Sequence, residues 1–213
     1  MRKTLLLLYF IGSSFIAFGQ SVRLEFKAGV SLSNQSVNTL GMAVKSTNLI
    51  GFHAGGLFNI DVMDDYLSIQ PGLFYSNKGY QYNQALSNGT QTVQKPIMGK
   101  IQLNYLEVPL NVLYKFEATR KINAYFGGGG YVGYGLSGTY AVQSQRTDIS
   151  FTKSIEGYQY KNPDYGVNAV IGSEISKHVV IEANYSLGLN NLSYYQSSII
   201  HNRSMGLSIG YMF

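Results

Sequence analysis

Eight charged or imidazole side chains could do chemistry in this chain, because each lies on the polar face of a segment in which polar and apolar residues alternate. Such a set could pass protons or ions, or supply a catalytic acid and base. It could also be a network of ion pairs filling a narrow interior, since an unpaired buried charge is costly. The similar numbers of positive and negative members favour the structural network. The set is Arg23, Glu25, Lys27, His53, Glu107, Lys115, Glu174 and Glu182.

The remaining reactive residue types do not assemble into a recognisable site. His53, His178 and His201 are scattered and lack the spacing of metal ligands. The chain has no cysteine, which excludes a disulfide framework, a thiolate metal site and a cysteine nucleophile. No nucleophile, base and orienting group can be placed at neighbouring positions. We therefore predict no enzymatic activity, no metal and no cofactor.

The elements that position the charged set are strands, because the polar and apolar residues recur with a period of two. In the first segment Leu24, Phe26 and Val30 lie on one face, while Arg23 and Lys27 lie on the other. Every later segment repeats this alternation. The eight predicted strands cover about 22–33, 49–60, 66–79, 100–116, 122–138, 165–175, 179–189 and 202–213.

The gaps between these strands alternate between long and short. Long polar loops are expected at about 34–48, 80–99, 139–164 and 190–201, the third of which could itself extend its hairpin, and short turns at 61–65, 117–121 and 176–178. This rhythm is typical of outer-membrane barrels, which have long outer loops and tight periplasmic turns. The predicted fold class is an all-β, eight-stranded antiparallel up-and-down transmembrane β-barrel, with apolar residues facing out and the charged set facing in.

Individual residues refine this barrel. Pro71 and Pro109 fall inside predicted strands and indicate a bulge or a local break in pairing, because proline lacks a ladder donor. The inward glycines of 127–135 leave room for a large residue opposite. Aromatic residues near strand ends could bind a ligand, but are expected to form interface girdles: Tyr66, Tyr75, Tyr114, Phe116, Tyr125, Tyr134, Tyr185 and Tyr211.

Residues 1–19 have the basic start, apolar run and small residues of a secretory signal peptide, with cleavage expected before Gln20 and the barrel domain over 20–213. The run is short for a spanning helix. The chain has 16 basic and 11 acidic residues, and cleavage of this segment would remove two of the basic ones, Arg2 and Lys3. The other basic residues form no run, so no nucleic-acid partner is expected.

Several stretches resemble the PorT-like outer-membrane β-barrel proteins of Gram-negative Bacteroidota. The more specific matches are Gln-Pro-Gly-Leu-Phe-Tyr-Ser at 70–76 and Tyr-Leu-Glu-Val-Pro-Leu at 105–110, which contains Glu107. Weaker matches lie at 27–30, 51–56, 127–135 and 206–213. The resemblance spans nearly the whole chain after the signal segment and implies the same fold and location. The namesake serves a protein-secretion system, but no residue here carries that role over.

The last strand ends in Ile209, Tyr211 and Phe213, which resembles the signal read by the barrel assembly machinery. The expected partners are therefore outer-membrane lipid, that machinery during biogenesis, and a protein or ligand at the outer loops, with the barrel itself a monomer. We predict a non-enzymatic structural, binding or assembly role through the long loops.

Four alternatives remain open at the level of sequence. The barrel could be a narrow channel or small-solute transporter, although eight strands enclose little free space. It could be an accessory barrel of a protein-secretion system, or a lipid-active barrel enzyme. It could also be a soluble calycin-like barrel, which requires the inverse faces, with apolar residues inside.

Overall fold

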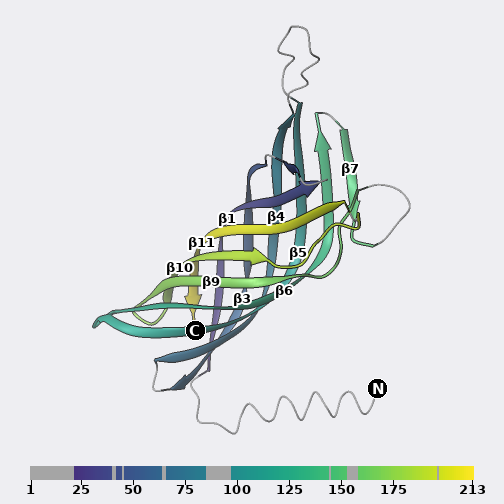
Figure 1. The fold of residues 1–213 in the computed structure, drawn as a ribbon. Coiled ribbons are helices and arrows are strands. Elements are labelled where there is room, and N and C mark those ends of the chain that lie inside the picture. Colours follow the sequence, from purple (N-terminus) through teal and green to yellow (C-terminus); the bar gives the residue numbers. More distant parts are fainter. Residues whose placement is uncertain are drawn as a thin grey trace, which may run out of the picture.

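Eight long antiparallel strands form a closed ring in the computed structural model (Figure 1). The structure describes residues 22–39, 42–44, 46–63, 66–84, 97–143, 145–152, 158–195 and 197–213. The predicted signal segment therefore lies outside the described residues. The ring strands are β1 (Val22–Thr39), β3 (Thr47–Met63), β4 (Leu67–Gln84), β5 (Ile97–Thr119), β6 (Ile122–Val142), β9 (Asp164–Ile175), β10 (Val179–Gly188) and β11 (Ser198–Met212).

Each ring strand pairs with its neighbour in the chain, and β1 closes the ring against β11. The closing ladder runs from Glu25↔Met212 to Thr39↔Ser198. Three short strands lie outside the ring: β2 (Met42–Val44) pairs with β1, β7 (Gln145–Ser150) with β6, and β8 (Tyr158–Gln159) with β7. The predicted eight-stranded up-and-down barrel is confirmed.

The strands are longer than the sequence indicated, and the loops correspondingly shorter. β1 continues to Thr39, β4 to Gln84 and β6 to Val142, all inside predicted loops, and β7 extends the third hairpin as its sequence allowed. The turn predicted at 117–121 shrinks to Arg120 and Lys121. A tilted strand needs only about 9–11 residues to cross a bilayer, so β5, with 23 residues, extends well beyond it. Polar residues continue a ladder that apolar residues have started, and polarity alone does not mark its end.

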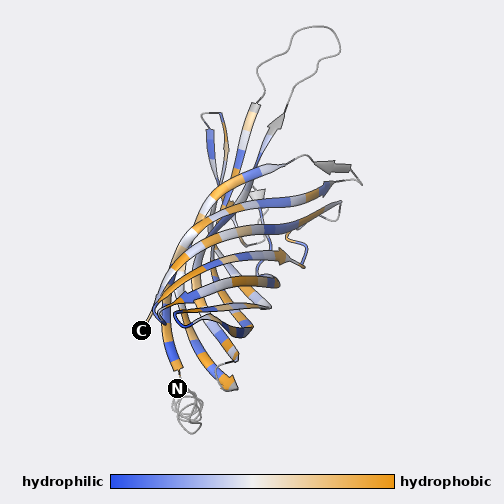
Figure 2. Cartoon of the chain, turned by 90° about the vertical axis from the view of Figure 1, so that its left-hand side faces the viewer, coloured by the Kyte–Doolittle hydropathy of each residue, from blue (hydrophilic) through white to orange (hydrophobic). Residues whose placement is uncertain are grey.

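Apolar side chains cover the outer wall, and the predicted charged side chains line the interior together with two buried apolar clusters. Along β11, Met205, Leu207 and Ile209 are exposed, whereas Ser204 and Ser208 are buried. The alternating bands in Figure 2 follow this pattern along the strands. So large an apolar surface is stable only against lipid. The inverse arrangement of a soluble calycin-like barrel is not observed in the described residues.

The two prolines lie where the sheet ladder is interrupted. Between β4 and β5 the partners jump from Pro71↔Leu110 to Phe74↔Glu107 without a change of register. The break falls opposite Pro109, which lacks an N–H donor like Pro71. The glycine-rich strand also behaves as expected, because a Cβ on Gly135 would lie 2.1 Å from the ring of Phe151.

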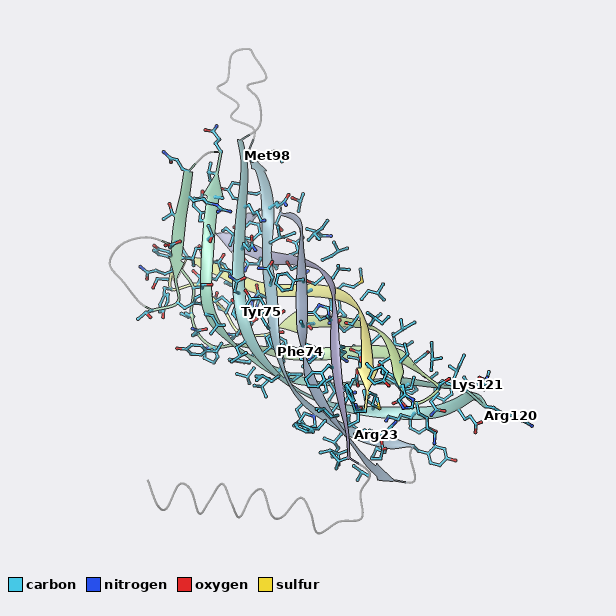
Figure 3. The ribbon with its side chains drawn as sticks, turned by 180° about the vertical axis from the view of Figure 1, so that it is seen from behind. Arg23, Phe74, Tyr75, Met98, Arg120 and Lys121 are labelled. Carbon is cyan, nitrogen blue, oxygen red and sulfur yellow. The ribbon has the colours of Figure 1, made fainter. Side chains whose placement is uncertain are left out.

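The opposite ends of the ring differ in construction (Figure 3). At the end that we call the short-turn end, Arg120 and Lys121 form the tip of the β5–β6 turn. Ser176 and Lys177, both with positive φ, form the β9–β10 turn, the backbone of a type I′ hairpin. Met98 marks the opposite, long-loop end. In outer-membrane barrels the short turns face the periplasm.

Candidate functional site in the barrel interior and at its outer mouth

A four-membered ring of ion pairs occupies the lumen near the short-turn end. We call Arg23, Asp61, Lys115 and Glu174 the short-turn set. Arg23 contacts Asp61 at 3.3 Å and Glu174 at 3.4 Å. Lys115 Nζ contacts the same two carboxylates at 3.1 and 3.0 Å. Two cations therefore balance two carboxylates, each cation bridging both.

The middle set lies further into the barrel and consists of Lys27, Glu25 and Glu182. Lys27 Nζ lies 2.7 Å from Glu182 Oε2 and 3.7 Å from Glu25 Oε1. Tyr125 donates to Glu182 Oε2 at 2.9 Å, and Asn59 donates to Glu25 Oε2 at 2.8 Å. One lysine thus faces two buried carboxylates, supported by neutral donors from β3 and β6.

The outer set lies nearer the long loops and again has one lysine facing two carboxylates. It consists of Lys78, Glu107 and Asp164. Lys78 Nζ pairs with Glu107 Oε1 and lies 3.5 Å from Asp164 Oδ2. It also lies 4.3 Å from the ring centre of Tyr131, a distance suited to a cation–π contact. Asn202 donates to Asp164 Oδ2 at 2.8 Å.

All eight side chains predicted for the interior point into it. The structure separates them into members of the three ion-pair sets and one residue outside these sets. Seven belong to the three sets. His53 stands apart from the ion pairs and shares a 2.6 Å hydrogen bond with Ser208. No groups of three or more His, Cys, Asp or Glu side chains that could hold a metal ion occur in the described residues. The described ranges also contain no helix long and apolar enough to cross a membrane.

Sequence reasoning missed three members of the network. From the sequence, Asp61 is placed in a turn and Asp164 in a loop, and Lys78 is left out of the charged set although it lies inside the predicted strand 66–79. The period of two would have found all three, because residues an even number of positions apart share a strand face. Asp61 lies on the face of His53, Lys78 on that of Ser68, and Asp164 on that of Glu174. The signal was present: the strands that hold Asp61 and Asp164 extend past their predicted bounds, whereas Lys78 already lies inside the predicted strand 66–79.

The aromatic residues require one correction. Tyr125 was assigned to an interface girdle, but it is only 2 % exposed and points into the lumen toward Glu182. Its space comes from Gly172, where an added Cβ would lie 2.4 Å from the Tyr125 hydroxyl. Tyr114, Tyr211 and Phe116 do point outward near the short-turn end. Whether they sit at the membrane interface stays a prediction.

A cavity of about 70 Å³ lies between the middle and outer sets. Lys27 and Glu182 from the middle set and Glu107 from the outer set line it. The rest of its wall mixes polar residues with apolar and aromatic ones: Ser31, His53, Ser76, Asn111, Asn168, Asn184, Ser186 and Ser204, with Leu57, Phe74, Pro109, Tyr131 and Val170. A volume of this size holds a few water molecules.

The outer mouth is covered by an apolar cluster that the third and fourth loops complete. Phe151 packs edge-on against Tyr105, with ring centres 5.6 Å apart. Tyr160 is 3 % exposed and donates to Gln35 Oε1 at 2.8 Å. Burial raises the pKa of the Tyr160 hydroxyl well above its ordinary value, because desolvation disfavours the phenolate. Leu192, fully buried, joins this cluster.

The residues predicted as an assembly signal lie on the outer wall at the closing seam. Ile209, Tyr211 and Phe213 are exposed. The Phe213 ring packs against Tyr211 at 4.9 Å and against Phe26 of β1 at 6.1 Å. Their role in assembly stays a prediction.

The closed ring, the apolar outer wall and the charged interior define an outer-membrane β-barrel. The sequence profile described as "Outer membrane protein beta-barrel domain" matches residues 18–194. The chain belongs to this outer-membrane β-barrel family, and the outer membrane is its location.

Three solved structures illustrate the similarity. The attachment invasion locus protein Ail of Yersinia pestis, in complex with sucrose octasulfate, is 15 % identical, with a TM-score of 0.41, covering 91 % of this chain and 99 % of Ail. Neisserial surface protein A is 11 % identical, with a TM-score of 0.48 and coverage of 92 % and 100 %. OprG of Pseudomonas aeruginosa is 13 % identical, with a TM-score of 0.46 and coverage of 91 % and 97 %. Among curated proteins, none matches the chain.

Proposed function

We propose that this protein is a non-enzymatic outer-membrane barrel that binds a partner through its outer loops and the strand extensions beneath them. The observation that carries the proposal is the covered outer mouth: Phe151, Tyr160 and Leu192 pack over the lumen, and ion pairs occupy the lumen below on both sides of the cavity. Such an interior leaves a solute little open path through the barrel, whereas the barrel holds the loop surface rigidly. Rigid scaffolds commonly carry function in their loops.

The extension formed by β6 and β7 is the part of that surface best suited to contact a protein. Gln145, Arg146, Thr147 and Asp148 are all exposed. Within the described residues, the outer side of β7 pairs only at Ile149 and Ser150, with β8. An edge with free backbone groups can accept a strand from a partner.

In-cell photocrosslinking tests this proposal. A photoreactive residue at Thr147, on the exposed edge, is expected to give a discrete adduct with one partner. The matched control is Tyr185 on the lipid-facing wall, where no protein adduct is expected. An absence of adducts at Thr147 and at other exposed loop positions would contradict the binding role.

The narrow-channel alternative has one observation in its favour, the cavity inside the lumen with its charged and polar lining residues. Planar-bilayer recording on the purified protein separates the two functions. The binding proposal predicts no steady conductance, because the cluster around Tyr160 covers the mouth. A stable, reproducible open level in the unmodified protein would favour the channel.

Within its family, we propose that the chain groups with the PorT-like proteins, supported by the motifs at 70–76 and 105–110. We further propose a monomer that the barrel assembly machinery inserts by reading its last strand. Deletion of the gene tests an accessory role in secretion. Loss of secreted proteins would favour that role, and unchanged secretion would favour the simple binding role.

A further inference from the structure

Two shallow grooves interrupt the apolar outer wall of the barrel. The first, which we call the seam groove, crosses β3, β1, β11 and β10 and has a volume of about 820 Å³. The second, the β9 groove, crosses β6, β9, β10 and β11 and has a volume of about 370 Å³. Exposed apolar residues form their sides, including Phe26 and Ile209 in the seam groove and Ile171 and Ile181 in the β9 groove. Lys27 also borders the seam groove, but its ammonium points into the lumen toward Glu182.

The grooves form where small residues replace large ones on the outer face. Ala28 and Ala54, which are partners in the β1–β3 ladder, both line the seam groove. Ser173 and Ala183 line the β9 groove. On β5, by contrast, the outward residues are large throughout: Leu106, Val108, Leu110, Val112, Tyr114 and Phe116. The two depressions are therefore local features of one side of the wall.

Both grooves reach the β9–β10 turn at the short-turn end. Ile175, the last residue of β9, lines the β9 groove, and Val179, the first residue of β10, lines the seam groove. These two residues pair in the ladder, and the turn 176–178 joins them. His178 of the turn also lies against Tyr211 of the seam groove, with ring centres 5.7 Å apart. One turn therefore stands at the end of both grooves.

This turn and its neighbour carry free positive charge. Lys177 and Arg120 are exposed and line one hollow at the short-turn end. A backbone hydrogen bond of 2.7 Å ties their two turns together. Within the described residues neither side chain forms an ion pair. Glu117 also lines the hollow, whereas Lys115 is already paired in the short-turn set. Two unpaired cations thus face one carboxylate.

We propose that the two grooves and these cations form a binding site for one anionic phospholipid. The two acyl chains lie in the grooves, and the phosphate lies against Lys177 and Arg120. Guanidinium and ammonium groups bind phosphate through charge-assisted hydrogen bonds. An anionic headgroup fits better than a zwitterionic one, because the cations outnumber the carboxylate. Since the short turns of outer-membrane barrels face the periplasm, the lipid belongs to the periplasmic leaflet.

The spacing of the grooves suits two chains of a single lipid. Both grooves include residues of β10 and β11, and neighbouring strands lie about 4.8 Å apart. Two chains joined at one headgroup can therefore enter both grooves from the β9–β10 turn. This site lies at the opposite end of the barrel from the outer loops, so the proposal is independent of the partner-binding function.

Native mass spectrometry of the purified barrel, released from detergent micelles, tests the site. The barrel is titrated with dioleoylphosphatidylglycerol or with dioleoylphosphatidylcholine, which has the same chains but no net charge. We expect one retained phosphatidylglycerol per barrel, bound at least about fivefold more tightly than phosphatidylcholine. A factor of this size corresponds to one basic side chain near a lipid surface.

A charge variant tests the headgroup contact. Lys177→Asn removes a cation and suits the positive φ of 64° at this position, because Asn tolerates that backbone conformation. It should weaken phosphatidylglycerol binding about fivefold and leave phosphatidylcholine binding unchanged. The control is Arg203→Gln, an exposed cation of β11 toward the long-loop end, which should change neither.

Two groove variants test the chain contacts. Ala54→Leu and Ala183→Leu each fill one groove and should lower the retention of both lipids. Ala169→Leu, at an exposed wall position outside both grooves, is the matched control and should not. Heat-modifiable gel mobility shows which variants are folded, and Lys177→Asn, in an exposed turn, decides if a groove variant is not.

Two results would overturn the proposal. Equal retention of the two lipids by the unmodified barrel would show that the cations do not select the headgroup. A broad distribution of lipid adducts that neither Lys177→Asn nor the groove variants alter would mean that lipid surrounds the wall without a defined site.

Discussion

The short-turn set of the lumen and the two sets beyond it are built from the same side-chain types but differ in charge balance. In the short-turn set, Arg23 and Lys115 each bridge the same two carboxylates and form a closed ring. In the middle and outer sets, Lys27 and Lys78 each face two carboxylates alone. The comparison teaches that the number of ion pairs describes such an interior poorly, whereas the ratio of cations to carboxylates separates a balanced network from one with an excess of carboxylates.

Removal of the outer lysine should have the largest effect. Lys78→Met leaves Glu107 and Asp164 buried without any cation, and we expect a loss of about 3–5 kcal/mol in the free energy of unfolding. Urea unfolding, followed by gel mobility without heating, measures this loss. Lys100→Met, in the neighbouring strand β5 at a half-buried position, is the control and should change stability by less than about 0.5 kcal/mol.

Removal of a lysine from the short-turn set should be milder. Lys115→Met leaves Arg23 within 3.4 Å of both Asp61 and Glu174, and Ser68 still donates to Asp61 at 2.5 Å. We expect a loss of about 2 kcal/mol in the same urea experiment. A loss as large as that of Lys78→Met would contradict the difference in charge balance between the short-turn set and the outer set.

A neutral contact above the outer set should have the smallest effect. Tyr160→Phe removes the hydrogen bond to Gln35 Oε1 while keeping the ring in its cluster. The expected loss is about 1 kcal/mol, measured by the same unfolding curves. A loss as large as that of Lys78→Met would mean that packing at the mouth, and not charge, determines stability around the outer set.

The fold and the inner face were predictable from the chain because both follow from a period of two. Once Arg23 and Lys27 are placed inside, every second residue follows, and the short turns at 120–121 and 176–178 fix the direction of the strands. The strand ends were not predictable, since polar residues continue the ladder of β1 past Ser33. Asp61 and Asp164 were missed for that reason, whereas Lys78 was missed although it lies inside the predicted strand 66–79.

The partners of each charge were beyond sequence reasoning for a different reason. Lys78 meets Asp164, which is 86 positions away, only because of the stagger between β4, β5, β6 and β9. No single-strand pattern contains that stagger. Apolar inward residues such as Leu113 and Tyr125 also break the polar pattern, because a narrow lumen is filled by volume as well as by charge.

The account is tested most directly by one matched pair of substitutions, Glu174→Gln and Glu182→Gln, with the free energy of unfolding of each measured in the same buffer. Both carboxylates are at most 3 % exposed. Glu174→Gln leaves two cations with one carboxylate and should destabilise the barrel by about 1–3 kcal/mol. Glu182→Gln leaves Lys27 paired with Glu25 alone and should leave stability unchanged or raise it. Equal destabilisation by both substitutions would contradict the charge imbalance on which the account rests.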